Sequence, residues 1–139
     1  MALFVCDASV AIAGLADDEA DPACEQLLVR AIMEGATAPA LMPYEIANIL
    51  TLKLRRKLIS AEGRRRALQS ILALNLVIDV VDASSPAFSR TIALADAHRL
   101  TVYDAAYLEL AMRLGAPLAT LDTALAKVAR AEKVEILPP

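Results

Sequence analysis

The feature that most constrains the fold is a regular alternation of short apolar runs with longer helical stretches. The runs that predict strands lie at residues 3–6, 37–41, 77–81, 117–121 and 134–137. Strands that alternate with helices are typical of a parallel sheet with helices packed on both faces. We therefore predict a single α/β domain over residues 1–139, built as one parallel sheet in a three-layer α/β/α arrangement.

The later helices are predicted from their capping residues and their apolar spacing. A long helix is expected over residues 44–58, directly after a proline. Asp104 is expected to cap a helix that ends near Gly115. The residues between 101 and 103 are expected to form a very short extended segment before that cap.

The composition indicates a folded chain in a reducing compartment. Apolar residues make up 58% of the chain, which is enough apolar surface to offset the entropy of folding and excludes a wholly disordered chain. The two cysteines, Cys6 and Cys24, are too few for a disulfide framework and are expected to be reduced and buried. No signal peptide is recognisable, and no run reaches the roughly 18 apolar residues of a membrane span. These features predict a cytoplasmic domain.

Four acidic residues stand where the predicted strands end or the next helices begin. Asp7 comes directly after the first strand, and Asp122 comes directly after the strand at 117–121. Glu45 lies in the first turn of the helix after the second strand, and Asp104 begins a later helix. Because functional residues of open α/β sheets gather at the carboxyl ends of the strands, we expect these carboxylates to converge.

Carboxylates that lie close together need a counter-charge, because repulsion and desolvation otherwise raise their pKa values. The segments around the four acids, VCDAS, PYEIAN, VYDAAY and TLDTAL, contain no lysine or arginine. A hard divalent cation such as Mg²⁺ takes oxygen ligands and is usually held by a few carboxylates and substrate phosphates. The sequence offers neither a His/Cys set for zinc nor a glycine-rich phosphate loop. The pattern therefore favours a divalent-metal site.

Each acid also has a structural explanation. Asp104 and Asp122 are good helix N-caps, and the helix dipole favours Glu45 in a first turn. Asp7 is harder to explain in this way, because an acid at the end of a buried apolar strand is costly without a function. The joint pattern is therefore more informative than any single acid.

Three polar side chains lie near the acids in the sequence: Ser9, Asn48 and Thr120. Their hydroxyl and amide groups could orient a carboxylate or hold a metal-bound water. Each is equally suited to an ordinary hydrogen bond at the end of an element. His98, the single histidine, lies in a polar helix end and is expected to be an exposed or capping side chain.

The chain resembles the PIN-domain ribonucleases, in particular the VapC-type toxins of prokaryotic toxin–antitoxin pairs. Four segments carry the resemblance: LFVCDASV, APALMPYEIANIL, LTVYDAAYLELA and PLATLDTALAKVA. It covers nearly the whole chain in order and length, and the segments around Asp104 and Asp122 are its most specific parts. The resemblance implies a PIN-like fold.

The resemblance also implies an activity and its partners. In that family an aspartate after the first strand, a glutamate early in a helix and two later aspartates bind one or two Mg²⁺ or Mn²⁺ ions. The matching residues are Asp7, Glu45, Asp104 and Asp122, with Ser9 and Thr120 as the hydroxyl residues beside the first and last. The family implies a metal-dependent endoribonuclease, usually a homodimer, that a small antitoxin holds inactive with a basic side chain.

Basic residues are concentrated between positions 53 and 66. This window holds half of the 14 lysines and arginines: Lys53, Arg55, Arg56, Lys57, Arg64, Arg65 and Arg66. In a chain with a net charge of −3, such a cluster is a candidate surface for RNA phosphates. The alternative is a solvated helix end, where cations are favoured by the helix dipole.

Two other functions stay open on the sequence. A catalytically silent PIN-fold module would bind RNA or protein without holding a metal. A phosphoryl-handling domain of the receiver type is less well supported, because Ala8 and Ser9 follow Asp7 where a second acid is needed. That class also needs a lysine after a later apolar strand, and the sequence has none there.

Overall fold

The computed structural model describes residues 3–15 and 21–139, which form five strands and seven helices. The strands are β1 (Val5–Cys6), β2 (Ala36–Pro39), β3 (Leu76–Asp79), β4 (Leu118–Ala119) and β5 (Ile136–Leu137). The helices are α1 (Ala8–Leu15), α2 (Pro22–Glu34), α3 (Met42–Arg55), α4 (Ala61–Ala73), α5 (Pro86–His98), α6 (Val102–Leu114) and α7 (Thr123–Ala131). The alternation confirms the predicted α/β class.

The strands form one parallel sheet in the order β3-β2-β1-β4-β5. Central β1 is apolar and fully buried, and its Val5 pairs with Thr37 of β2 on one side and Leu118 of β4 on the other. The chain moves outward from β1 to β3 and then crosses to β4 on the opposite side of β1. The connections therefore reverse direction between β1 and β4, where open α/β sheets have a crevice at the carboxyl ends of the strands.

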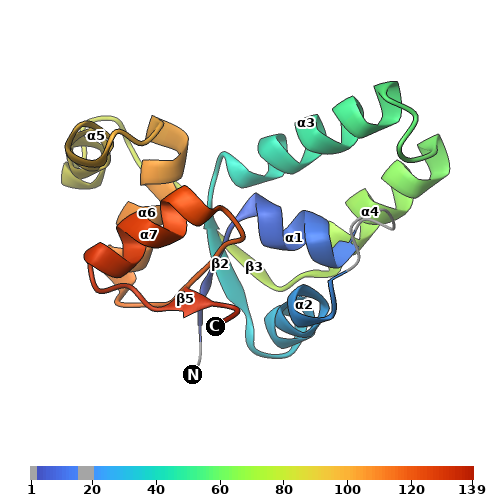
Figure 1. Cartoon of the computed structure of the whole chain (residues 1–139), viewed down its shortest axis with the longest axis horizontal. Helices are drawn as coiled ribbons and strands as arrows, with labels where there is room; N and C mark the ends of the chain where they lie inside the picture. Colours follow the sequence, from blue (N-terminus) through green and yellow to red (C-terminus); the bar gives the residue numbers. More distant parts are fainter. Residues whose placement is uncertain (1–2, 16–20) are drawn as a thin grey trace.

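The helices lie in two layers around this sheet. Figure 1 shows α1, α2, α3 and α4 on one side of the sheet and α5, α6 and α7 on the other. On the second side, α6 packs directly against β1, β2 and β4 and buries Tyr107, Leu108 and Leu110. The three-layer α/β/α arrangement predicted from the sequence is confirmed.

Helices α3 and α4 pack together as a hairpin whose tip extends away from the sheet (Figure 1). The first half of α3 is anchored by Met42, Ile46 and Leu50, which are fully buried. Beyond Arg55 the chain turns, and Lys57 takes a left-handed conformation with φ of 60°. The hairpin therefore carries the basic window 53–66 outward from the body of the molecule.

The start of α6 differs from the prediction. Residues 101–103 are not an extended segment, because Val102 and Tyr103 already belong to the helix. Thr101 is the N-cap, and its Oγ1 accepts a hydrogen bond from the N–H of Asp104 at 3.0 Å. Asp104 therefore lies in the first turn and is not the cap. The helix ends as predicted at Gly115, whose φ of 62° lies in the left-handed region that favours glycine.

Cys6 and Cys24 are free and buried, as predicted. Burial raises the pKa of the Cys6 thiol to about 12. Within the described residues, no helix is both long enough and apolar enough to cross a membrane.

Candidate functional site

Asp7 follows β1 directly, and two hydroxyl groups hold its carboxylate. Its Oδ2 accepts hydrogen bonds from Thr120 Oγ1 at 2.6 Å and from Ser9 Oγ at 3.0 Å. The residue is only 7% exposed, and this desolvation raises the pKa of Asp7 although the hydrogen bonds oppose the rise. The carboxylate is therefore fixed in position, while its negative charge is incompletely compensated.

The same two hydroxyls connect Asp7 to the end of β4. Ser9 Oγ accepts a hydrogen bond from the N–H of Leu121 at 3.0 Å, and Thr120 Oγ1 accepts one from the N–H of Asp122 at 3.1 Å. Each hydroxyl thus donates to Asp7 and accepts from the segment that leads into α7. These bonds fix the ends of β1 and β4 relative to each other across the reversal in the sheet.

Glu45 lies in the first turn of α3 and is held by a tyrosine from α6. Its Oε1 accepts a hydrogen bond from the hydroxyl of Tyr107 at 2.6 Å, and Tyr107 is fully buried. Desolvation raises the pKa of Glu45, and repulsion from Asp7 and Asp104 raises it further, while the Tyr107 bond opposes both effects. The tyrosine therefore sets the position of the one glutamate in the site.

Tyr107 is a site residue that sequence reasoning missed. The signal for it was present, because Tyr107 stands three residues after Asp104 in one helix. Residues three apart are neighbours on a helix surface, so the tyrosine and the aspartate face the same direction. Its partner Glu45 lies 62 positions away in the chain, however, and only the tertiary structure brings the two together.

The two remaining aspartates begin α6 and α7. Burial raises the pKa of Asp104, and repulsion from Asp122 and Asp7 raises it further. Asp122 is the N-cap of α7, and its Oδ1 accepts a hydrogen bond from the N–H of Leu125 at 2.9 Å. The structural explanation by capping therefore applies to Asp122 and not to Asp104, whose helix is capped by Thr101.

The four acids converge electrostatically at one edge of the sheet. The negative charge of Asp7 raises the pKa values of Glu45 and Asp104, and the charge of Asp122 raises the pKa of Asp104. None of the ion pairs among the described residues involves any of the four. In residues 3–15 and 21–139, no group of three or more His, Cys, Asp or Glu side chains is placed so that it could hold a metal ion as it stands. The arrangement is therefore an open acidic site, which we call the acidic edge.

Two other polar residues from the prediction have no described hydrogen bond to the acids. Asn48 is exposed on α3, three residues beyond Glu45 and so on the same side of the helix. His98 ends α5 and lies in a pair with Glu132, with 2.7 Å between its Nε2 and the glutamate Oε1. His98 is therefore half-buried and paired with Glu132, whereas the sequence led us to expect an exposed or capping side chain.

Most of the predicted basic cluster lies on the surface of the α3–α4 hairpin. Arg55, Arg56 and Lys57 are exposed around its tip. Arg65 pairs with Glu62 on α4, and Arg64 Nη1 lies 3.5 Å from Thr51 Oγ1 of α3.

Lys53 differs from the expectation. It is 7% exposed, because it lies on the same face of α3 as the core residues Ile46 and Leu50. Lys53 therefore does not belong to the exposed basic cluster, which consists of Arg55, Arg56, Lys57, Arg65 and Arg66 together with the half-buried Arg64.

Comparisons with known proteins agree with this architecture. Residues 4–131 match the PIN domain family. Ribonuclease VapC3 of Pyrobaculum aerophilum is 36% identical over 87 residues, a segment that covers 63% of this chain and 66% of that protein. The chain thus spans just under two thirds of the length of that relative.

A solved structure shows the same fold. The crystal structure of PAE2754 from Pyrobaculum aerophilum matches with a TM-score of 0.70 at 22% identity, over 97% of this chain and 83% of that one. The match to the PIN domain family extends over most of the chain and includes all four residues of the acidic edge. This chain belongs to the PIN domain family.

Proposed function

We propose that this chain is a divalent-metal-dependent endoribonuclease that hydrolyses RNA phosphodiester bonds. The observation that carries the proposal is the acidic edge, where Asp7, Glu45, Asp104 and Asp122 come from four separate segments and are linked by electrostatic repulsion. Membership of the PIN domain family and the similarity to a protein named a ribonuclease support the same activity. The proposal treats residues 1–139 as a single nuclease domain.

The chemistry of the acidic edge fits Mg²⁺ or Mn²⁺. All four donors are carboxylate oxygens, which are the ligands that hard divalent cations prefer. Mg²⁺ keeps several waters and needs only one or two direct carboxylates, so an open edge suits it better than a closed cage. Burial raises the pKa values of Asp7, Glu45 and Asp104, repulsion from neighbouring acids adds to the rise for Glu45 and Asp104, and a bound cation would offset that cost.

Asp7, Glu45 and Asp104 would hold the ion, and Asp122 would bind it or orient another ligand. A divalent ion in such a site supplies an activated water and neutralises charge that develops on the phosphate. The chain's own contribution is positioning: Ser9 and Thr120 fix Asp7, and Tyr107 fixes Glu45. Side chains that are already oriented need little reorganisation when the RNA binds.

The exposed basic cluster on the α3–α4 hairpin is proposed to bind RNA phosphates away from the cleavage point. Arg55 stands ten residues after Glu45 on α3, which corresponds to roughly 15 Å along the helix. That distance is suited to phosphates several nucleotides from the reacting one. Arg56, Lys57 and Arg64 continue the positive surface around the tip.

We propose that the enzyme acts in the cytoplasm as a homodimeric toxin that a small antitoxin restrains. A hollow lined by Ser9, Ile12, Ile49, Leu121 and Asp122 lies beside the acidic edge and supports this proposal. A segment with apolar side chains for this hollow and one basic side chain would cover the site and neutralise its carboxylates. Such a segment would compete with both the metal ion and the RNA.

Cleavage of total bacterial RNA by the purified chain tests the proposed activity. The reaction is run with Mn²⁺ or with EDTA, and the new RNA ends are mapped by sequencing. We expect discrete ends that require Mn²⁺ and disappear in Asp104→Asn, prepared in the same way. Equal cleavage by the wild type and the variant would contradict the proposal. Absence of both RNA cleavage and Mn²⁺ binding would instead favour the catalytically silent module.

A further inference from the structure

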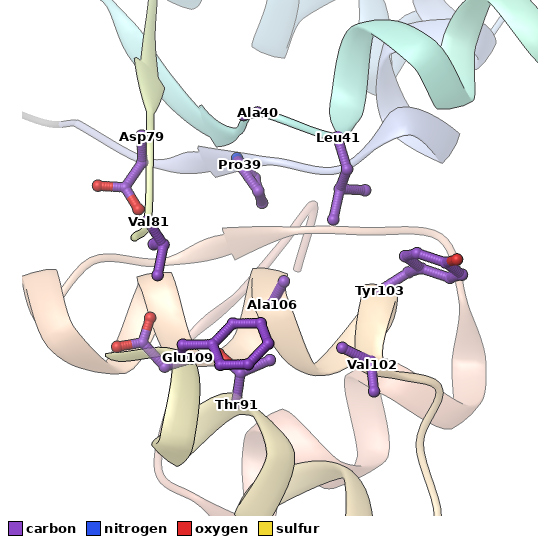
Figure 2. A pocket seen from close by; sticks show the side chains of 11 residues that line it. Pro39, Ala40, Leu41, Asp79, Val81, Thr91, Val102, Tyr103, Ala106 and Glu109 are labelled. Carbon is purple, nitrogen blue, oxygen red and sulfur yellow. The ribbon is translucent and has the colours of Figure 1, made fainter. Parts of the chain in front are cut away.

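A cavity of about 210 Å³ opens beside the acidic edge (Figure 2). It lies between the segment that leads from β2 into α3, the end of β3, and helices α5 and α6. Its apolar walls include Pro39, Leu41, Val81, Phe88, Val102 and Ala106. Figure 2 shows Pro39 and Leu41 on one side of the space, facing Ala106 and Val102 on the other.

The cavity and the acidic edge share the starts of two helices. At α3, the carbonyl of the cavity residue Leu41 accepts a hydrogen bond from the N–H of Glu45 at 3.1 Å, so the two residues lie one turn apart. At α6, the cavity residue Tyr103 directly precedes Asp104. One helical turn is about 5.4 Å, so the cavity lies within a nucleotide's reach of the acids.

The size and walls of the cavity suit one planar ring system. An apolar cavity of roughly 150 Å³ admits benzene, whereas drug-sized ligands occupy pockets of about 300 Å³ or more. A cavity of about 210 Å³ therefore fits a fragment such as a nucleobase. Phe88 is 38% exposed in the cavity wall, so its ring is available for stacking. Proteins commonly bind the bases of single-stranded RNA by stacking them on aromatic side chains.

Apart from Tyr103, whose hydroxyl can also donate, the polar side chains in the wall offer hydrogen-bond acceptors. Glu109 and Asp79 line the cavity with carboxylates, and Thr91 already donates its hydroxyl hydrogen to the carbonyl of Ala87 at 2.9 Å. Arg113 lies 2.6 Å from Asp79 Oδ2 and 2.9 Å from Glu109 Oε1, and Arg90 lies 3.1 Å from Glu109 Oε1. Two arginines that do not line the cavity thus balance the two carboxylates that do, which reduces the repulsion of a polyanion.

We propose that this cavity binds one nucleobase of the RNA strand that is cut at the acidic edge, and that it selects a base with an exocyclic amino group. The inference rests on the proposed ribonuclease activity. Adenine, cytosine and guanine carry an amino group that donates hydrogen bonds, whereas uracil presents only carbonyl oxygens at the equivalent positions. A carbonyl facing the carboxylates of Asp79 and Glu109 would lack a donor, so uracil is disfavoured.

Filling the cavity tests the proposal. Ala106→Leu adds a larger side chain to the cavity wall, and Ala97→Leu makes the same change on α5 in another surface groove, which shares only Glu109 with the cavity. The substrates are short unstructured RNAs randomised at each position around the cut, with Mn²⁺ present. At one position relative to the cut, we expect the wild type and Ala97→Leu to cleave RNAs with adenine, cytosine or guanine at least tenfold more efficiently than RNAs with uracil. In Ala106→Leu we expect this ratio to drop to twofold or less, mainly because KM rises for the preferred RNAs.

A preference that persists unchanged in Ala106→Leu, or no preference in the wild type, would overturn the proposal. Circular dichroism shows whether Ala106→Leu folds, and Phe88→Ala, which removes the ring from the wall, replaces it if it does not. For Phe88→Ala we expect the same loss of base preference.

A binding experiment separates this proposal from the proposed ribonuclease activity. Adenosine, cytidine and uridine are titrated into the metal-free wild-type chain with EDTA, and the amide NMR signals of Thr91 and Ala106 are followed. We expect saturable shifts with adenosine and cytidine, weaker ones with uridine, and none in Ala106→Leu. Nucleoside binding without any RNA cleavage would count against the ribonuclease proposal alone. The nucleobase proposal would be overturned if no nucleoside shifts these signals. It would also be overturned if the signals shift only with protein concentration, because a second copy of the chain would then fill the cavity.

Discussion

At the scale of single residues, the acidic edge is a set of carboxylates held in place in a setting that disfavours their charge. Burial raises the pKa values of Asp7, Glu45 and Asp104, and hydrogen bonds from Ser9, Thr120 and Tyr107 compensate only in part. The ionised site therefore costs folding free energy at neutral pH until a cation binds. This cost has measurable consequences for stability and for metal affinity.

The first consequence is that Asp104→Asn stabilises the metal-free chain. The raised pKa of Asp104 means that its contribution to stability is present below the ordinary aspartate pKa and is lost as the pH rises through the raised value. Removing the charge at pH 7 should therefore raise the free energy of unfolding by about 0.5–1 kcal/mol, a range reduced for solvent screening. The gain should vanish below about pH 4, where the wild type is protonated as well.

Urea unfolding in EDTA across this pH range measures the difference. Asp96→Asn on the exposed side of α5 is the matched control and should show no comparable gain. A variant that is less stable than the wild type at pH 7, or a difference independent of pH, would contradict the electrostatic account of the site.

The second consequence concerns Tyr107. Tyr107→Phe removes the hydroxyl that holds Glu45 and leaves the buried ring in place. Groups that orient metal ligands typically contribute 10–100-fold to metal affinity, so we expect Mn²⁺ to bind roughly tenfold more weakly. Calorimetric titration measures this, with Tyr44→Phe on the exposed surface of α3 as the control. Unchanged affinity in Tyr107→Phe would show that Glu45 does not need the tyrosine.

The sequence predicts that the four acids follow strands or begin helices, as the structure has them, and predicts the groups that hold them only in part. The acids are predictable because they follow strands or begin helices, which are local features. Thr101 could also be recognised as a helix N-cap, because Thr-x-x-Asp before an apolar run is a capping signal. The β-branched pair Thr101-Val102, however, favours a strand. The bond from Tyr107 to Glu45 joins helices distant in the sequence and cannot be read from local spacing.

At the scale of elements, all four acids stand at helix N-termini. Asp7 directly precedes α1, Glu45 and Asp104 lie in the first turns of α3 and α6, and Asp122 caps α7. Each helix start carries about half a positive charge, which favours nearby anions. The helix starts therefore moderate the repulsion among the carboxylates, and they also favour an incoming phosphate group.

An arginine network joins α6 to β3 and α5 behind the cavity that Pro39 and Ala106 line. Arg113 lies 2.6 Å from Asp79 Oδ2 and 2.9 Å from Glu109 Oε1, and the Glu109 side chain is only 4% exposed. Arg113→Met leaves this buried carboxylate with Arg90 alone, so we expect a loss of about 2–4 kcal/mol in the free energy of unfolding. Urea unfolding measures the loss, and Arg130→Met at the exposed end of α7 is the control. A loss below about 0.5 kcal/mol, the range of ordinary surface substitutions, would contradict the structural importance of the network.

The α3–α4 hairpin is expected to act through charge alone. Replacing both Arg55 and Arg56 with alanine should weaken RNA binding similarly for all sequences and reduce its salt dependence. For single-stranded RNA, the slope of log K against log salt should become shallower by about 0.7 for each phosphate that the variant no longer neutralises. Filter binding in a catalytically inactive Asp104→Asn background measures this, and Arg130→Ala is the control. An unchanged slope would mean that the cluster is only a solvated helix end.

At the scale of the whole molecule, the site follows from the topology of the sheet. The chain leaves β1 toward β2 and β3 and returns on the other side as β4, so Asp7 and the Thr120–Asp122 segment emerge beside each other. Alternating elements predict a parallel sheet with helices on both faces, because that pattern is encoded along the chain. The order of the strands and the outward projection of the hairpin depend on packing between distant segments, so local patterns do not specify them.

Manganese-induced broadening of amide NMR signals tests most directly whether four distant segments form one metal site. Bound Mn²⁺ broadens the signals of nearby amides, so a small fraction of Mn²⁺ should broaden Ala8, Ile46, Ala105 and Leu121 together. These residues neighbour the four acids, while Ala67 on α4 and Ala95 on α5 should stay sharp. Asp104→Asn should require a much higher Mn²⁺ concentration for the same broadening. Broadening confined to other surface acids, or identical in the variant, would contradict a metal centre at the acidic edge.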